Sequence, residues 1–175
     1  MIYTPKEDSF LMEEQVKRFA KGKTVLDVGS GSGIQALAAK KSGAKSVIAS
    51  DINPEVIKHL KGLGLNAVES DLFENIKGKF DLIIFNPPYL PEDEREDKES
   101  RLTTTGGKSG DEVLLKFLKE VKLHLTPGGF VMILLSSLTP RTRILKVLEK
   151  NMMKREIISF KKIFMETLEV WKIQE

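Results

Sequence analysis

Short apolar runs alternate with helical patterns along most of the chain, and this alternation limits the fold more than any other feature of the sequence. The runs have the length and composition of strands that are buried on both faces of a parallel sheet. They occupy residues 24–28, 46–49, 65–68, 82–85 and 130–135, and helical patterns occupy residues 9–20, 33–41, 54–61, 111–125 and 140–150. This alternation predicts right-handed crossovers and an open, doubly wound α/β sheet with helices on both faces.

The end of the chain and two helix starts carry more specific signals. Residues 157–160 and 167–173 are strand-like and flank a turn near 161–166, which predicts an antiparallel hairpin. The pair Asn53-Pro54 predicts a helix N-cap with proline at the first helical position, and Thr139-Pro140 predicts the same for a later helix. Ligands of a doubly wound sheet bind outside the carboxyl ends of its strands, so the residues that follow each strand are candidates for a site.

The composition is that of a globular protein. The chain has 175 residues, of which 41% are hydrophobic and 30% charged, and its formal net charge is +3. This predicts one domain over residues 1–175 with no membrane span and no signal peptide, and we expect a cytoplasmic protein. The lack of cysteine excludes disulfides, thiol catalysis and cysteine-ligated zinc, and we expect no metal site. The lysines are dispersed, which favours a solvated surface over a nucleic-acid stripe.

A glycine-rich turn follows the first predicted strand, in the segment Asp27-Val28-Gly29-Ser30-Gly31-Ser32-Gly33. Glycine permits a tight turn and lets a ligand approach the backbone closely, and the helix that follows offers free N–H groups. The third glycine of a dinucleotide-binding fingerprint is replaced by Ile34, which argues against a dinucleotide. Taken alone, the turn also fits a strand–helix connection that binds nothing.

Acidic residues follow the second and third predicted strands. Asp51 lies about 20 residues beyond the glycine turn, where a carboxylate can accept hydrogen bonds from both hydroxyls of a ribose. Asp71 and Leu72 suit an adenine ring, because Asp71 can accept from the exocyclic amine while Leu72 covers one face. An exposed acid at a strand end and a helix N-cap are the alternative interpretations of Asp51 and Asp71.

Together these residues resemble the cofactor motifs of the class I S-adenosylmethionine-dependent methyltransferases. The acid-x-Gly-x-Gly-x-Gly pattern and the two later acids match in order at Asp27, Gly29, Gly31, Gly33, Asp51 and Asp71. The resemblance implies S-adenosyl-L-methionine as cofactor and S-adenosyl-L-homocysteine as product. It also implies a Rossmann-like, seven-stranded, mostly parallel sheet whose last strand is antiparallel.

The fourth predicted strand ends in Asn86-Pro87-Pro88-Tyr89, the most informative tetrapeptide of the chain. Two prolines stiffen the backbone and remove two N–H donors, which leaves the Asn86 side-chain oxygen and the Pro87 carbonyl as a rigid pair of acceptors. A planar –NH2 group can donate to both acceptors and stack on Tyr89, which steers its lone pair toward a methyl donor and aligns the reacting atoms. We therefore predict catalytic roles for Asn86, Pro87 and Tyr89, substrate contacts from all four residues and a cofactor contact from Asn86. A Pro-Pro turn that ends a strand is the structural alternative.

Further segments extend the resemblance to nearly the whole chain. The chain is similar to the archaeal and eukaryotic branch of the HemK-type methyltransferases at Tyr3-Thr4-Pro5-Lys6-Glu7-Asp8-Ser9-Phe10-Leu11, Asp51-Ile52-Asn53-Pro54, Gly106-Gly107-Lys108-Ser109-Gly110 and Glu166-Thr167-Leu168. The resemblance implies that residues 1–22 cover the cofactor, that Ser9 and Ile52 contact it, and that Gly106 and Gly107 bind the substrate. It implies N5-methylation of the glutamine in the Gly-Gly-Gln loop of a class I translation release factor. Thr104-Thr105 depart from the tryptophan or alanine that is common before the glycine pair.

The resemblance also implies a partner, because the catalytic subunits of this branch work with a small zinc-binding activator protein. The expected topology leaves the third strand at a sheet edge, in the segment Gly64-Leu65-Asn66-Ala67-Val68-Glu69. An unpaired edge offers backbone donors and acceptors to an added strand. We therefore expect a heterodimer that docks on this edge, with a monomer whose edge strand is short as the alternative.

The nature of the methylated nitrogen stays open at the level of the tetrapeptide, which suits a glutamine amide, adenine or cytosine. A DNA or RNA amino-methyltransferase would reach such a pocket by base flipping, but the chain shows neither a basic stripe nor a target-recognition domain. A protein-lysine methyltransferase fits less well, because a tetrahedral amine must first be deprotonated. A non-catalytic cofactor-binding partner is the remaining alternative.

The charged segment 91–100 and the Thr/Gly-rich residues after it predict a long loop.

Overall fold

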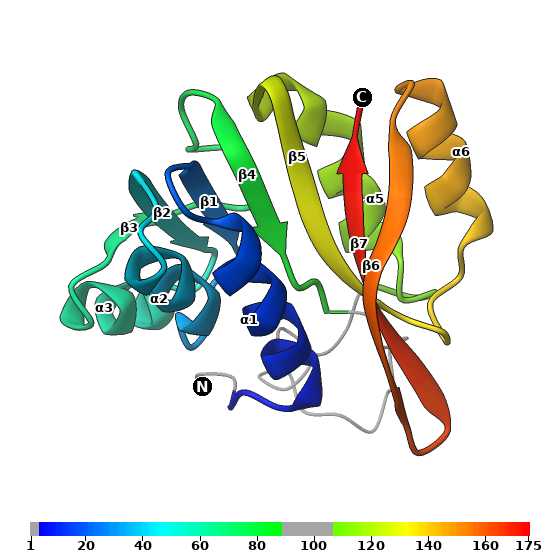
Figure 1. Ribbon diagram of the computed structural model, residues 1–175, viewed down its shortest axis with the longest axis horizontal. Helices are drawn as coiled ribbons and strands as arrows, with labels where there is room; N and C mark the ends of the chain where they lie inside the picture. The colour runs from blue at the N-terminus through cyan, green and yellow to red at the C-terminus, as the bar shows by residue number, and fades with distance from the viewer. Residues whose placement is uncertain (1–3, 89–106) are drawn as a thin grey trace.

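The computed structural model describes residues 4–88 and 107–175 (Figure 1). The strands of these ranges are β1 (Thr24–Val28), β2 (Ser46–Asp51), β3 (Asn66–Glu69), β4 (Phe80–Phe85), β5 (Leu125–Ser136), β6 (Lys154–Ile163) and β7 (Glu166–Gln174). The helices are α1 (Glu7–Phe19), α2 (Ile34–Lys41), α3 (Pro54–Gly62), α5 (Glu112–Glu120) and α6 (Thr142–Lys150), with a 3-10 turn at Val121–His124. The long loop expected over 91–100, together with Tyr89 and Gly106, lies outside the described residues.

The seven strands form one sheet in the order β3-β2-β1-β4-β5-β7-β6. Neighbouring strands from β3 to β5 are parallel, and β7 is antiparallel to both β5 and β6. This confirms the expected doubly wound sheet with an antiparallel last strand, and it confirms that the third strand lies at an edge. The hairpin of β6 and β7 extends beyond the end of β5 (Figure 1).

Helices cover both faces of the sheet, as expected. On one face α1 and α2 pack on alternate side chains of the central strands, with Met12 and Val16 against Leu82 and Ile84. α3 lies on the same side as these two helices (Figure 1). On the other face α5 and α6 enclose a core that contains the fully buried Trp171. Burial of both faces explains why the central strands are continuous apolar runs instead of alternating ones.

The strand register brings the carboxyl ends of three strands together. Val28 at the end of β1 is level with Ser50 in β2 and with Phe85 at the end of β4. The residues that immediately follow these three positions therefore lie side by side at one edge of the sheet. This edge holds the glycine turn, Asp51 and Asn86, which are far apart in the sequence.

Of the two predicted helix N-caps, one is confirmed and one is wrong. Asn53 caps α3 as expected, because its side-chain oxygen accepts a hydrogen bond from the Glu55 N–H at 2.9 Å. The cap predicted at Thr139-Pro140 is wrong: α6 begins at Thr142, and its N-cap residue is Arg141. Thr139 instead closes a turn, since its N–H donates to the Ser136 carbonyl at 3.0 Å, and its side chain is buried.

Some element boundaries also differ from the expected ones. The helix expected over 111–125 is a nine-residue α5 followed by the 3-10 turn, and β5 begins at Leu125, five residues before the apolar run. The early part of β5 contains Pro127 and two glycines, and a register shift between Phe80 and Leu82 accommodates it. Within the described ranges, no helix is long and apolar enough to cross a membrane.

Candidate functional site

The glycine turn has the backbone geometry that only glycine adopts readily. Gly29, Gly31 and Gly33 all lie in the left-handed region, with φ of 64°, 49° and 81°. At Gly33 packing adds a second constraint, because a Cβ there would come within 2.8 Å of Leu60 in α3. The turn thus carries the chain from β1 into α2 at the edge where the other strands end.

Asp51 ties the turn to the end of β2. Its two carboxylate oxygens accept hydrogen bonds from the Gly31 N–H and the Asn53 N–H, both at 3.0 Å. The side chain is half-buried, so it remains accessible from the carboxyl edge. Each oxygen has lone-pair capacity left, which is the requirement for a carboxylate that binds a diol. The next residue, Ile52, is 56% exposed although it is apolar.

Asp27 is buried beneath the turn, with 2% of its surface exposed. Its carboxylate accepts one backbone hydrogen bond, from the Ala36 N–H at 3.2 Å. Loss of solvent is the largest effect on the group, and the negative charge of Asp51 acts in the same direction, so burial raises the pKa of Asp27 to about 7. The sequence motif identified this acid but gave no sign that it titrates near neutrality.

Asp71 and Leu72 follow β3, as predicted, but in different environments. One Asp71 oxygen accepts from the Lys116 ammonium at 2.8 Å, and this hydrogen bond raises the pKa of Lys116. Leu72 is 8% exposed and belongs to the core beneath α5. Its φ of 49° is unusual for a residue with a Cβ, so the surrounding structure holds this corner in place. Lys116 carried no sequence signal.

Asn86 follows β4 and contacts Asp8, which lies near the start of the described chain. Its side-chain NH2 donates to the Asp8 carboxylate in α1 at 2.8 Å. Its side-chain oxygen is buried and has no hydrogen-bond partner among the described residues. A buried acceptor without a donor costs about 1–3 kcal/mol, so this oxygen is poised to receive a hydrogen bond from a ligand. Pro87 is buried and Pro88 half-buried beside it.

The N-terminal helix reaches the same edge through its first turn. Ser9 is buried, and its carbonyl accepts a hydrogen bond from the Gln35 side chain at 2.9 Å. Gln35 is itself buried in the first turn of α2, directly after the glycine turn. The hydrogen bonds of Gln35 and Asp8 therefore link the start of α1 to the helix after the glycine turn and to the end of β4. The sequence indicated neither Gln35 nor the contact of Asp8 with Asn86.

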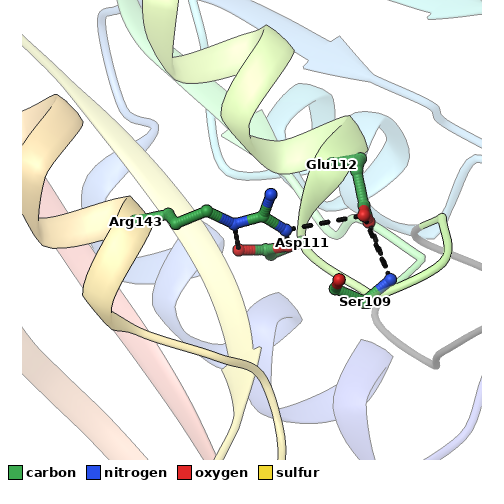
Figure 2. A network of polar contacts seen from close by, with 4 residues as sticks. All are labelled: Ser109, Asp111, Glu112 and Arg143. Atoms are coloured by element: carbon green, nitrogen blue, oxygen red, sulfur yellow. Dashed lines mark hydrogen bonds and ion pairs between the residues drawn. The ribbon is translucent and has the colours of Figure 1, made fainter.

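The chain re-enters the described structure at Gly107, next to a polar network (Figure 2). Gly107 has a φ of 106°, and a Cβ there would overlap the Glu112 side chain. The Glu112 carboxylate accepts from the Ser109 N–H at 3.1 Å. The fully buried Asp111 pairs with Arg143 of α6 through two hydrogen bonds, one of them from Nε at 3.0 Å. These contacts hold the predicted Gly107 segment against the first turn of α5 and hold that turn against α6.

The structure thus brings most of the predicted residues to one edge, and their chemistry is complementary to an adenosine-like group with a planar nitrogen donor beside it. Carboxylates at Asp51 and Asp71 offer acceptors, the glycine turn offers close backbone approach, and the Asn86 oxygen offers an acceptor that no residue within 4–88 and 107–175 occupies. Tyr89 and Gly106 lie outside the described residues.

Comparison with known proteins adds independent information. The profile of the methyltransferase small domain family matches residues 8–165. A Methanocaldococcus jannaschii protein assigned as a protein N5-glutamine methyltransferase is 40% identical over 98% of this chain and 92% of its own length. The release factor glutamine methyltransferase of Deinococcus radiodurans is 37% identical over 73% of this chain, a match that spans 49% of the relative's length.

A solved structure is similar to this chain over nearly its whole length. A chain of the E. cuniculi Mtq2–Trm112 complex, described as responsible for methylation of the eRF1 translation termination factor, superposes with a TM-score of 0.81 at 26% identity. The match covers 99% of this chain and 98% of that chain.

The titration of Asp27 yields a prediction for stability. The folded state holds its proton up to about pH 7, whereas the unfolded chain releases it near pH 4, so the folded state binds more protons between these values. The free energy of unfolding should therefore fall as pH rises from about 4 to about 7, by a few kcal/mol for this group. In Asp27→Asn this decline should be absent, because the amide cannot ionise. Urea unfolding of both proteins at several pH values measures the difference, and parallel curves for the two would contradict it.

Proposed function

Because the chain belongs to the methyltransferase small domain family, and within it to the HemK-type protein N5-glutamine methyltransferases, we propose that it methylates the side-chain nitrogen of a glutamine in a translation release factor. The observation that carries the proposal is the buried Asn86 oxygen, which lacks a partner among the described residues at the carboxyl end of β4. A primary amide has an N–H that can satisfy this acceptor. The glutamine in the Gly-Gly-Gln loop of a class I release factor carries such an amide.

S-adenosyl-L-methionine would supply an electrophilic methyl group on a positively charged sulfur. The residues present fit this cofactor. Asp51 has the half-buried carboxylate that the ribose hydroxyls need, and the exposed Ile52 beside it offers apolar surface to the adenine. Asp71 has one oxygen engaged by Lys116 and one available for the exocyclic amine. Ser9 and Asp27 complete the proposed binding residues around the glycine turn.

The chain's own groups then account for the reactivity of a poor nucleophile. An amide nitrogen shares its lone pair with the carbonyl, so it attacks weakly in water. Hydrogen bonds from its N–H groups to the Asn86 oxygen and the Pro87 carbonyl would orient the lone pair and hold it in line. Methyl transfer would form the N–C bond as the S–C bond breaks and would leave the nitrogen cationic, so these acceptors would bind it more strongly than they bind the ground state. The extra proton then leaves to solvent, and no side-chain base is needed beforehand.

The experiment that tests the function presents labelled cofactor with a release factor, DNA and tRNA in separate reactions, followed by mass spectrometry of the modified product. We expect methyl transfer to the release factor, on the glutamine of its Gly-Gly-Gln loop, and the activity would then belong to the cytoplasm, where translation ends. A release factor whose glutamine is changed to glutamate is the matched control and should accept no methyl group. Methylation of nucleic acid alone would assign the chain to the amino-methyltransferases of nucleic acids.

Removal of the acceptor should separate catalysis from binding. Asn86→Ala should lower kcat at least about 100-fold, because the hydrogen bond is strongest as the nitrogen becomes cationic. The Kd for S-adenosyl-L-methionine should change much less, since Asp51 and the glycine turn are untouched. Steady-state kinetics and calorimetry measure the two quantities, and turnover near that of the wild type would refute the role of Asn86.

Asp51→Ala should show the opposite pattern in binding. Loss of the carboxylate removes the proposed ribose acceptor, so the Kd for the cofactor should rise at least about tenfold, which corresponds to ~1.4 kcal/mol. Glu55→Ala, an exposed acid in the first turn of the neighbouring α3, is the control and should bind the cofactor normally. An unchanged Kd in a folded Asp51→Ala protein would show that the ribose is held elsewhere.

We also propose a small zinc-binding activator protein as a partner, docked by strand addition on β3. This strand is the sheet edge and pairs with β2 on one side. Leu65 and Ala67 are buried beneath α3, so the surface available to a partner comes from the exposed Asn66, the half-buried Val68 and the neighbouring Leu63, which is 39% exposed. The likeness to a chain of a two-protein complex supports the existence of a partner.

Charge at this edge should weaken the complex. After co-expression with the host's activator, Leu63→Glu should reduce co-elution in size-exclusion chromatography, because a carboxylate would be buried against the added strand. Leu145→Glu is the matched control, since Leu145 is equally exposed, at 39%, on α6 of the opposite face. Equal co-elution of both variants would place the partner elsewhere, and separate elution of the wild-type proteins would mean that the chain acts alone.

A further inference from the structure

The first turn of α1 contributes a buried carboxylate to the end of β4. Asp8 is 5% exposed, and its Oδ2 accepts the hydrogen bond from Asn86 Nδ2 at 2.8 Å. The two residues are 78 positions apart in the sequence. The contact therefore exists only because α1 packs over the sheet with its first turn at the carboxyl edge, where Figure 1 shows the start of the helix.

The chemistry of the two groups fixes which end of the Asn86 amide faces Asp8. An asparagine side chain has one acceptor end and one donor end, and its terminal torsion alone favours neither orientation. An ionised carboxylate has acceptors only, so it can bind the NH2 end and would repel the oxygen. The Asn86 oxygen is consequently turned away from Asp8, into a buried position without a partner among the described residues.

We propose that Asp8 is a positioning residue for catalysis: its carboxylate holds the Asn86 amide in the orientation that presents the oxygen to the substrate N–H. This inference rests on the proposed function, because the substrate donor is the glutamine amide. It gives the N-terminal helix a part in the chemistry in addition to its expected contact with the cofactor through Ser9. Asp8 would not touch the reacting atoms and would act through Asn86 alone.

A second consequence concerns charge. As the substrate nitrogen becomes cationic, the Asn86 oxygen is its neighbour and the Asp8 carboxylate lies behind the Asn86 amide. A hydrogen-bonded chain that ends in a negative charge strengthens the acceptor nearest the cation, because each bond polarises the next. The effect should appear in the rate of methyl transfer and leave ground-state binding of the substrate almost unchanged.

Kinetics of matched variants tests the inference. Asp8→Ala should lower kcat at least about tenfold, with the KM for the release factor and the Kd for the cofactor within about twofold of the wild type. Asp8→Asn should lower kcat less, because the new amide can accept from Asn86 in one orientation and donate to its oxygen in the other. Glu13→Ala is the control, since Glu13 is an acid of the same helix that pairs with Lys17 at 2.8 Å, and its kcat should be unchanged.

The orientation can also be observed without turnover, by NMR of the Asn86 side-chain NH2, whose signals are assigned by their loss in Asn86→Asp. In the wild-type protein these protons should exchange slowly with water, because they are buried and bonded to Asp8. In Asp8→Ala the signals should shift and exchange faster, and in Glu13→Ala they should stay unchanged. If Asp8→Ala does not fold, Asp8→Asn takes its place in both measurements.

The outcomes separate this inference from the proposed function. A wild-type protein that methylates no release factor refutes the function, while the NMR arm still reports whether Asp8 orients Asn86. Wild-type kcat in the Asp8 variant, or unchanged Asn86 signals, overturns the positioning role. A loss that lies wholly in the Kd for the cofactor also overturns it, because Asp8 would then be a binding residue.

Discussion

The parallel pairing of β2, β1 and β4 is the constraint on which the rest of the structure depends. A one-residue slip of a strand buried on both faces would exchange the side chains that face its two cores and disrupt the close packing of both, so the register is strongly specified. That register places the ends of β1 and β4 level with Ser50. The glycine turn, Asp51 and Asn86 are therefore neighbours because of the strand register, and the hydrogen bond from the Gly31 N–H to Asp51 adds to it.

Polar groups at this edge are arranged for different purposes. Asp51 is satisfied by two backbone N–H groups and is held rigidly, which suits recognition of a ligand. Asp27 is buried with one backbone N–H as a donor to its carboxylate, and its raised pKa is the consequence. The Asn86 NH2 donates to Asp8, and its oxygen has no hydrogen-bond partner in the part of the chain that the structure describes. A buried carboxylate and a buried acceptor without a donor both cost folding stability. Groups of this kind are expected where a protein binds and transforms a ligand.

The sequence predicted well what depends on local pattern and strand topology. The strand–helix alternation, the helices on both faces, the α3 cap at Asn53 and the tight glycine turn follow from periodicity and from residue chemistry, and the seven-stranded sheet was implied by the family resemblance. The prediction at Thr139-Pro140 was wrong because a cap-then-proline pattern also suits a turn, and there the Thr139 N–H closes such a turn. Residue propensities alone cannot distinguish a helix N-cap from a turn where tertiary contacts determine which of the two forms.

The contacts that shape the site were beyond sequence reasoning for a physical reason. Asp8 with Asn86, Lys116 with Asp71 and Arg143 with Asp111 join elements that are distant in sequence and have no spacing rule. Each is determined by how helices sit on the sheet, and each tunes a residue or segment that the motifs had identified. The motifs thus identified the acidic and acceptor residues, while the packing of the helices on the sheet determines their orientation and their hydrogen-bond partners.

In the proposed reaction the Asn86 oxygen receives the N–H of a glutamine amide. The most direct measurement is a crystal structure of the protein with S-adenosyl-L-homocysteine and a peptide that contains Gly-Gly-Gln. We expect a distance of about 2.7–3.2 Å between the Asn86 oxygen and the glutamine nitrogen, with the Asn86 NH2 still hydrogen-bonded to Asp8. A glutamine side chain held by other groups, with the Asn86 oxygen turned away from it, would refute the proposed role of Asn86.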